Sequence, residues 1–260
     1  KLGFKIFSPD INESDVTFKV VYDNDKSPIG INFGLSAIKN VGENSINQLV
    51  TERKDNGKFI NIPDLLKRLN NSILNKRIIE ALIFSGSFRS IEDNQNYLEK
   101  NIERIINYNS FFHKNNNCNQ TNLFDEFSDD LEQFNSKNFK FWDINTKLNK
   151  ELESFGFYLS EHPTKFYQSF FDSNKLLKLS DLIDIMNKEK INNNFFSSLV
   201  LINDLNERVS RIGKKFAFLS FSDSTASVDS ICFSEVLEKY GEKNIRIGDI
   251  YIVKFKIQCF

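Results

Sequence analysis

The sequence has few cysteines that could form disulfides, and it has no long apolar run that could span a membrane. Its 260 residues include 4 prolines, 3 cysteines and 2 histidines. An odd number of cysteines without a CxxC pair argues against structural disulfides and predicts a reducing compartment. No apolar run approaches the roughly 18 residues that a membrane-spanning helix needs. The first residues lack both an initiator methionine and the apolar stretch of a signal peptide, so we expect the chain to start inside a longer protein.

Motifs for catalysis are also missing. His113 and His162 are far apart, and neither has the spacing to cysteine or carboxylate residues that a metal site requires. No P-loop, GxSxG motif or paired-carboxylate strand occurs. His162 stands before Pro163 at a predicted helix end, where we interpret it as a capping or packing residue. We therefore expect no catalytic residue, no metal ligand and no cofactor in this chain.

The residues that are present make up a globular composition with an uneven charge. Hydrophobic residues are 40% of the sequence, charged residues are 27%, and the formal net charge is -1. Residues 39–77, however, hold eight basic and four acidic side chains, whereas residues 117–161 hold four basic and nine acidic ones. A local basic excess is what phosphate binding requires, because released counterions supply most of its sequence-independent affinity.

Hydrophobic periodicity predicts an α+β multidomain fold of five segments. Residues 1–35 contain a β-hairpin, and residues 36–113 form a helical domain with two helix-hairpin-helix units in tandem. Residues 114–140 are a polar, acidic linker, and residues 141–192 are a helical connector. In residues 193–260, alternating strands with one helix predict an oligonucleotide-binding (OB) fold, a Greek-key β-barrel that is incomplete because its fifth strand is missing.

The turn Ile38–Gly42 is the first candidate site. In a helix-hairpin-helix, such a turn brings the backbone close to a DNA phosphate, and the following helix offers unpaired N–H groups. Gly42 suits that approach, and Asn40 can replace a glycine because asparagine tolerates positive φ. A plain corner between two helices is the alternative, but the local basic excess favours binding to the backbone of duplex DNA. The predicted contacts are Lys39, Asn40, Gly42, Arg53 and Lys54.

The second candidate site is the peptide QTNLF at Gln120–Phe124, inside the predicted linker. A glutamine followed by leucine and phenylalanine in an extended segment is typical of a peptide that docks in an apolar pocket. Leu123 and Phe124 would be its anchors, and Gln120 would bind the polar rim of the pocket. The alternative is a linker whose leucine and phenylalanine pack against its own domain.

The third candidate site is the first hairpin of the predicted barrel. Its turn is basic around Gly213, and phenylalanines follow in the next strand. Proteins that bind single strands use basic turns for phosphates and aromatic strand faces for base stacking. The alternative is that the aromatic residues fill the barrel core. The residues concerned are Arg208, Arg211, Lys214 and Lys215 in the turn, and Phe216, Phe218 and Phe221 in the strand.

Taken in order, these segments resemble the C-terminal region of the alpha subunits of bacterial DNA polymerase III, the replicative C-family polymerases. The likeness lies in SPDINES at 8–14, in IGINFGLSAIKNVGENSI and NKRIIEALIFSGSF for the two hairpins, and in ELESFGFYLSEHP at 151–163. The sequence departs from the family at Asn40, where a glycine is usual. In the second hairpin, the usual aspartate and second glycine after Gly86 are missing, although Arg89 would still suit a phosphate.

The resemblance implies part of a DNA-directed DNA polymerase that transfers nucleotidyl groups, with Mg²⁺ at palm carboxylates outside this chain. It implies duplex contacts at both hairpins, including Gly86 and Arg89, and a sliding-clamp motif at Gln120, Leu123 and Phe124. The implied partners are duplex DNA, single-stranded DNA, the sliding clamp (beta subunit) and other replicase subunits in a bacterial cytoplasm. The alternatives are a non-enzymatic DNA-binding or clamp-associated module, such as a gene remnant, and an adaptor that binds no nucleic acid.

Overall fold

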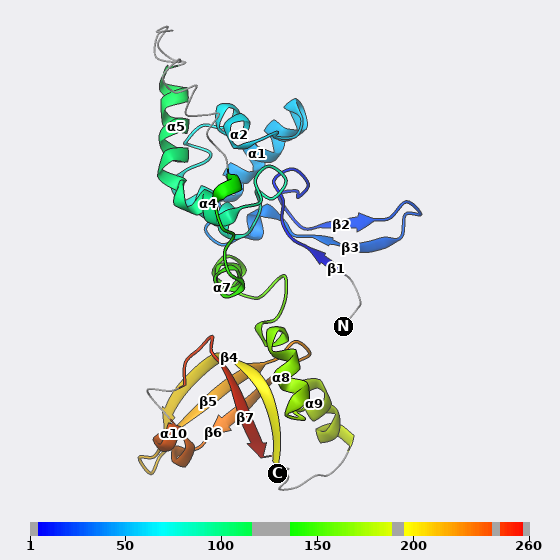
Figure 1. Ribbon diagram of the computed structural model, residues 1–260, viewed down its shortest axis with the longest axis vertical. Helices are drawn as coiled ribbons and strands as arrows, with labels where there is room; N and C mark the ends of the chain where they lie inside the picture. The colour runs from blue at the N-terminus through cyan, green and yellow to red at the C-terminus, as the bar shows by residue number, and fades with distance from the viewer. Residues whose placement is uncertain (1–4, 116–135, 189–194, 241–244, 257–260) are drawn as a thin grey trace. The chain divides into compact units, whose positions relative to one another are not determined.

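The chain folds as two compact units, Lys1–Ser160 and Glu161–Phe260. The computed structural model describes residues 5–115, 136–188, 195–240 and 245–256 (Figure 1). No helix among these residues is long and apolar enough to cross a membrane. The two units are a coarser division than the five segments predicted above, and the bounds of those segments stay a prediction.

A three-stranded sheet opens the first unit. Its strands are β1 (Lys5–Phe7), β2 (Lys19–Tyr22) and β3 (Pro28–Asn32), with β3 in the middle. Strands β2 and β3 form the predicted antiparallel hairpin, whereas the parallel pairing of β1 with β3 was not predicted. A Cβ on Gly30 would lie 2.3 Å from the carbonyl oxygen of Lys5, so only glycine lets the two strands approach this closely.

Helices make up the rest of the first unit, and polar side chains set where several of them begin. Asn61, Asn75, Asn94 and Asp143 each accept a hydrogen bond from a backbone N–H in the first turn of the helix that follows, which is the usual role of an N-cap residue. The elements are η1 (Leu35–Ala37), α1 (Glu43–Asn56), α2 (Ile62–Arg68), α3 (Lys76–Phe84), α4 (Gln95–Lys100), α5 (Ile102–Asn115), η2 (Ser136–Asn138) and α7 (Ile144–Phe155).

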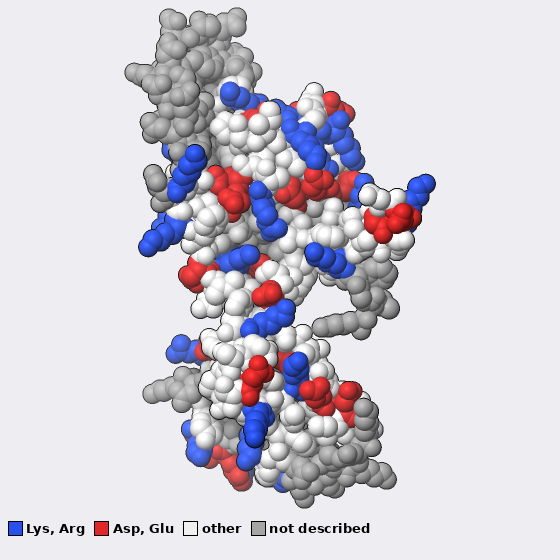
Figure 2. Space-filling model, turned by 45° about the vertical axis from the view of Figure 1, so that its right-hand side comes forward, with Lys and Arg blue, Asp and Glu red and all other residues white. Residues whose placement is uncertain are grey.

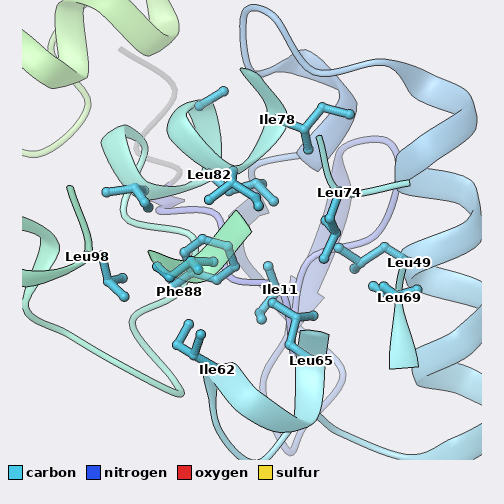
Figure 3. Close-up of a cluster of buried hydrophobic side chains, with 14 of the residues drawn as sticks. Ile11, Leu49, Ile62, Leu65, Leu69, Leu74, Ile78, Leu82, Phe88 and Leu98 are labelled. Carbon is cyan, nitrogen blue, oxygen red and sulfur yellow. The ribbon is translucent and has the colours of Figure 1, made fainter. Parts of the chain in front are cut away.

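The apolar faces of these helices meet in one core, which includes a residue from the segment before the hairpin. Ile11 is fully buried, and Figure 3 shows it among Leu65, Ile62 and Phe88, which come from α2 and from the turn after α3. The motif SPDINES therefore contributes directly to the core of the helical domain.

Asn12, the neighbour of Ile11, fixes this segment by hydrogen bonds. Its side-chain Oδ1 accepts from the backbone N–H of Phe59 at 2.8 Å, and its Nδ2 donates to the carbonyl oxygen of Phe59 at 2.9 Å and to Ser90 Oγ at 3.0 Å. Asp10 accepts from the backbone N–H and the hydroxyl of the same Ser90. Two loops that are far apart in the sequence are thereby held to one short turn.

The second unit is a curled four-stranded antiparallel sheet with short helices (Figure 1). The spatial order β6-β5-β4-β7 places the fourth strand beside the first, as in a Greek key. The predicted succession of three strands, a helix and a fourth strand is confirmed. The elements are η3 (Pro163–Tyr167), α8 (Gln168–Ser173), α9 (Leu179–Lys188), β4 (Phe195–Val209), β5 (Lys215–Ser222), β6 (Ser227–Cys232), α10 (Ser234–Tyr240) and β7 (Ile250–Lys256).

The alternation predicted for β5 is also present. Ala217, Leu219 and Phe221 are buried on the inner face and pack with residues of α9 and α10, whereas Phe218 on the outer face is 49% exposed. Within the predicted helical connector of residues 141–192, the sequence analysis did not identify η3, which begins at Pro163, or α8.

His162 has the capping role that its position suggested. Its ring Nδ1 accepts from the backbone N–H of Thr164 at the start of η3, and Nε2 lies 2.9 Å from Ser222 Oγ. Burial lowers the pKa of His162 to about 4, although the nearby Asp223 carboxylate acts in the opposite direction. The imidazole is therefore neutral near pH 7 and serves as a hydrogen-bonding group.

We predict that replacing Asn12 by alanine destabilises the first unit. The Asn12→Ala variant leaves the buried N–H and C=O of Phe59 without partners, which should lower the free energy of unfolding by about 2–4 kcal/mol. Urea unfolding followed by circular dichroism measures the change. The control is Asn24→Ala, at an exposed turn position. Equal stabilities of the two variants would show that Asn12 does not hold the loops together.

Candidate nucleic-acid interface

The turn Ile38–Gly42 has the backbone geometry expected of a hairpin that approaches phosphate. Asn40 is in the left-handed region with φ 69°, so it takes the conformation that glycine usually provides. Gly42 has an ordinary φ of -80° and is the N-cap residue of α1, without a side-chain cap hydrogen bond. A Cβ on Gly42 would meet nothing within 4 Å. The start of α1 is therefore open to an outside acceptor.

Two hydrogen bonds, from the backbone of Lys39 and from the side chain of Arg77, hold this turn in place. The backbone N–H of Lys39 donates to the carbonyl oxygen of Ser154 at the end of α7, at 2.9 Å. The ammonium of Lys39 lies 2.9 Å from the position that a Cβ on Gly156 would occupy, so the glycine makes room for it. Arg77, at the start of α3, donates to Asn40 Oδ1 at 2.6 Å. Lys39, Asn40 and Arg77 are all exposed.

Arg77 is the residue that sequence reasoning missed at this site. It was counted in the basic excess of residues 39–77, but 37 residues separate it from Asn40. No local pattern predicts a contact over that separation. Only the packing of α3 beside the first turn brings the guanidinium to the hairpin.

Several of the basic side chains in residues 39–77 bind other groups of the protein itself, and Arg53 is the first of them. The guanidinium of Arg53 donates to the carbonyl oxygens of Ile11 at 2.5 Å and Ser14 at 2.7 Å. Burial lowers the pKa of Arg53, which reflects its place inside the fold. These hydrogen bonds give Arg53 a structural role, so we do not retain it among the candidate DNA contacts.

Other basic side chains in this segment are also paired. Arg68 binds the carboxylate of Glu52 at 2.9 Å and carbonyl oxygens at the end of α1. Lys54 lies 3.5 Å from Asp15, whose pKa is lowered first by a hydrogen bond from the backbone of Val16 and then by Lys54. The view in Figure 2 agrees, because basic and acidic side chains lie close together on the first unit.

Two further ion pairs join Lys58 to Glu13 and Lys76 to Glu103. Each neutralises a basic charge counted in residues 39–77 with an acidic one from outside that range. The sequence count therefore overstates the charge that faces an outside ligand, and Lys39 and Arg77 become the leading candidates.

The second predicted turn is a helix C-cap. Gly86 has φ 72°, its N–H donates to the carbonyl oxygen of Ile83, and the N–H of Ser87 donates to that of Leu82. This pair of bonds is a Schellman motif, and it occupies the Gly86 amide. The Arg89 guanidinium lies 3.3 Å from the position of a Cβ on Gly86. A phosphate contact at this turn would therefore come from Arg89 and not from the glycine amide.

The hairpin between β4 and β5, predicted to belong to a barrel, presents basic residues beside an aromatic surface. Gly213 is left-handed with φ 81°, which closes a three-residue loop. Phe216 and Phe218 lie on the outer face with ring centroids 5.5 Å apart in an edge-to-face arrangement. Phe221, in contrast, is 3% exposed and belongs to the core, so it cannot stack on a base. Arg208, Arg211, Lys214 and Lys215 are exposed.

The peptide Gln120–Phe124 lies outside the described residues, so its role as a docking peptide stays a prediction. Within the residues that the structure does describe, no group of three or more histidine, cysteine, aspartate or glutamate side chains could hold a metal ion.

Comparison with known proteins finds a matching motif over the region that contains the turn Ile38–Gly42. Residues 3–98 match the family model described as the helix-hairpin-helix motif, so the first unit carries a motif of that class. The chain is 31% identical over 242 residues to DNA polymerase III subunit alpha of Borreliella burgdorferi, covering 92% of this chain and 20% of that protein. It is 31% identical over 259 residues to the subunit of Buchnera aphidicola, covering 97% and 21%.

A third relative, DNA polymerase III subunit alpha of Neisseria meningitidis serogroup B, is 36% identical over 161 residues, or 62% of this chain and 14% of that protein. The chain thus spans about a fifth of the length of the first two relatives. It belongs to the family of DNA polymerase III alpha subunits, and the resemblance predicted from its sequence is confirmed.

We predict that position 40 needs a residue that tolerates positive φ. Asn40→Ala and Asn40→Gly both lose the hydrogen bond to Arg77, but only alanine is strained at φ 69°. The free energy of unfolding of the Asn40→Ala variant should therefore be about 1 kcal/mol lower than that of Asn40→Gly, as measured by thermal or urea unfolding. The same pair at the exposed helical residue Asn47 should show the reverse order, because alanine favours helix. The same order at both positions would contradict a left-handed requirement at the turn.

Proposed function

We propose that this chain is the DNA-gripping and clamp-tethering part of a replicative DNA polymerase. The observation that carries the proposal is the turn Ile38–Gly42, where a left-handed Asn40 stands between the exposed Lys39 and the uncapped start of α1. Family membership supports it, because the relatives are named as polymerase subunits. The ligand of this turn is the phosphate backbone of duplex DNA.

The grip works through the backbone and two cations. The first N–H groups of α1 point out of the helix, and the helix dipole adds partial positive charge there. Because Gly42 has no side chain, a phosphate oxygen can come close to these amides. Lys39 and Arg77 supply the full charges. None of these groups distinguishes bases, so the binding is independent of sequence, as a polymerase that travels along DNA requires.

The second turn would add a weaker contact. We place a phosphate beside the Arg89 guanidinium, since the Gly86 amide is engaged in the Schellman motif. The unequal chemistry of the two turns makes the first one the dominant contact.

We predict that removal of Lys39 and Arg77 reduces the salt dependence of duplex binding. The double variant Lys39→Ala, Arg77→Ala should lower the magnitude of the slope of log K against log[salt] by up to about 2, because each phosphate contact contributes about 0.9. Fluorescence anisotropy with a labelled duplex at several salt concentrations measures the slope.

The matched control for that experiment is Lys58→Ala, Lys76→Ala, which removes the same charge from residues that are ion-paired within the fold and were not predicted to contact DNA. Its slope should stay near that of the unchanged chain. If both double variants lower the slope equally, bulk charge and not the turn governs binding, and the hairpin proposal is wrong.

The second unit would bind single-stranded DNA as an OB fold. Its Greek-key order and the position of α10 between the third and fourth strands support that fold, although only four strands are described. In OB folds the face of the second and third strands and the loop before them bind oligonucleotides. Here that face carries Phe216 and Phe218, and that loop carries Arg211 and Lys214.

The parent protein would be a DNA-directed DNA polymerase of the bacterial cytoplasm that works with other replicase subunits. Nucleotidyl transfer in such enzymes uses two metal ions, and Mg²⁺ would bind palm carboxylates outside this chain. This chain alone would then extend no primer. Its contribution is affinity, because holding the product duplex keeps the enzyme on its template.

The peptide Gln120–Phe124 would tether the polymerase to the sliding clamp. Its sequence supports this, with two apolar anchors after a glutamine in an acidic segment. A tether raises the effective concentration of the polymerase at the primer end and so raises processivity. The clamp contact therefore complements the weak, sequence-independent grip on duplex DNA.

We predict that replacing Gln120, Leu123 and Phe124 together by alanine reduces clamp binding at least about a hundredfold, because the anchors carry most of the affinity of such a peptide. Surface plasmon resonance with immobilised sliding clamp measures the affinity. A control with Asn119→Ala and Asn122→Ala changes the same peptide at positions without an assigned anchor. Clamp binding retained in the triple variant would remove the tether from the proposed function.

A further inference from the structure

The tip of the barrel hairpin carries an apolar side chain with almost no cover. Ile212 is 80% exposed, which makes it the most exposed large hydrophobic residue among those that the structure describes. It follows Arg211 and precedes Gly213 and Lys214. An isolated exposed isoleucine on a strand is ordinary, but this one lies at the tip of a turn, between Arg211 and Lys214.

The hairpin holds Ile212 in a defined position. The N–H of Gly213 donates to the carbonyl oxygen of Ser210 at 2.9 Å, and the N–H of Ser210 donates to the carbonyl oxygen of Lys214 at 2.8 Å. The N–H of Lys214 also binds Ser210 Oγ at 3.0 Å. With Gly213 left-handed, this is a closed three-residue turn at the end of two long paired strands. The backbone of the tip is therefore fixed by hydrogen bonds within the turn.

The surface behind the tip carries exposed aromatic and apolar side chains of the kind on which unpaired bases stack. On the outer face of β5, Phe218 is 49% exposed and lies opposite Ile231 of β6, itself 47% exposed, and opposite Asn206 of β4. Arg208 lies opposite Phe216 in the same sheet. An apolar tip, flanking cations and an aromatic platform follow one another along a single hairpin.

We propose that Ile212 is a wedge that packs between bases where a single strand leaves a duplex. The proposal rests on the proposed binding of single-stranded DNA by the second unit, and it adds a residue and an action to that site. Isoleucine is one of the side chains that proteins insert between base steps, and unstacking is least costly where a neighbouring base is already unpaired. Arg211 and Lys214 bind the phosphates on either side of the wedge.

The wedge gives the second unit an activity beyond holding a strand. With Ile212 in the stack, the first unpaired base cannot return to its partner, and the bases that follow it stack on Phe218. The platform alone would bind any single strand equally well. The wedge makes the junction between duplex and single strand the preferred position.

The test uses the full chain and a forked DNA that carries 2-aminopurine. The probe is placed either at the first unpaired position or in the middle of the single-stranded tail, and its fluorescence rises when the base unstacks. For the unchanged chain we expect a rise at the junction. Ile212→Ser should remove most of that rise and weaken fork binding about five- to tenfold, in keeping with the stacking energy of one base. Ile212→Leu should keep both.

Two controls separate the wedge from folding and from charge. Ile60→Ser changes an isoleucine that is 79% exposed in the first unit and should leave the junction signal intact. Arg211→Ala should weaken fork binding but preserve the junction signal at saturation. A junction signal in Ile212→Ser equal to that of the unchanged chain overturns the wedge. If the unchanged chain fails to bind a single strand at all, the proposed function of the second unit is what fails.

Discussion

The first unit depends on one buried side chain, the amide of Asn12. Its bonds to both backbone groups of Phe59 fix the chain just after α1, while Ser90 and the bond from Ile11 N–H to Ser87 fix the chain just after α3. Both helices are thereby held at their C-terminal ends by the same short turn. Their N-terminal ends then meet at the first hairpin, where Arg77 contacts Asn40. The geometry of the candidate DNA site is a consequence of a constraint on the far side of the core.

The same arrangement explains why charge alone is a poor guide to this interface. Arg53 and Arg68 satisfy backbone carbonyl oxygens, and several lysines pair with carboxylates, so most basic side chains stabilise the fold. A grip that uses helix amides and two cations needs little net charge. A chain with a formal net charge of -1 can therefore hold a polyanion, because close approach at one turn matters more than the average field.

The fold was largely predictable where local chemistry decides it, and the site only in part. Alternation in β5 and the basic turn before it predicted a hairpin with one buried face, and Asn40 was predicted to tolerate positive φ. Long-range packing left no such pattern. Neither the pairing of β1 with β3 nor the meeting of Arg77 with Asn40 follows from spacing, because each joins residues from separate elements.

Arg53 and Gly86 show the converse, that a residue can fit a functional motif by type and yet be used by the fold. Arg53 has the right charge at the right helix, but its donors face carbonyl oxygens of the turn that carries Asn12. Gly86 has a positive φ, but that φ closes a Schellman motif. Removing both from the list of direct ligands concentrates the proposed grip on the first hairpin. At the second turn, the proposed contact with a phosphate is then made by the Arg89 guanidinium and not by a backbone amide.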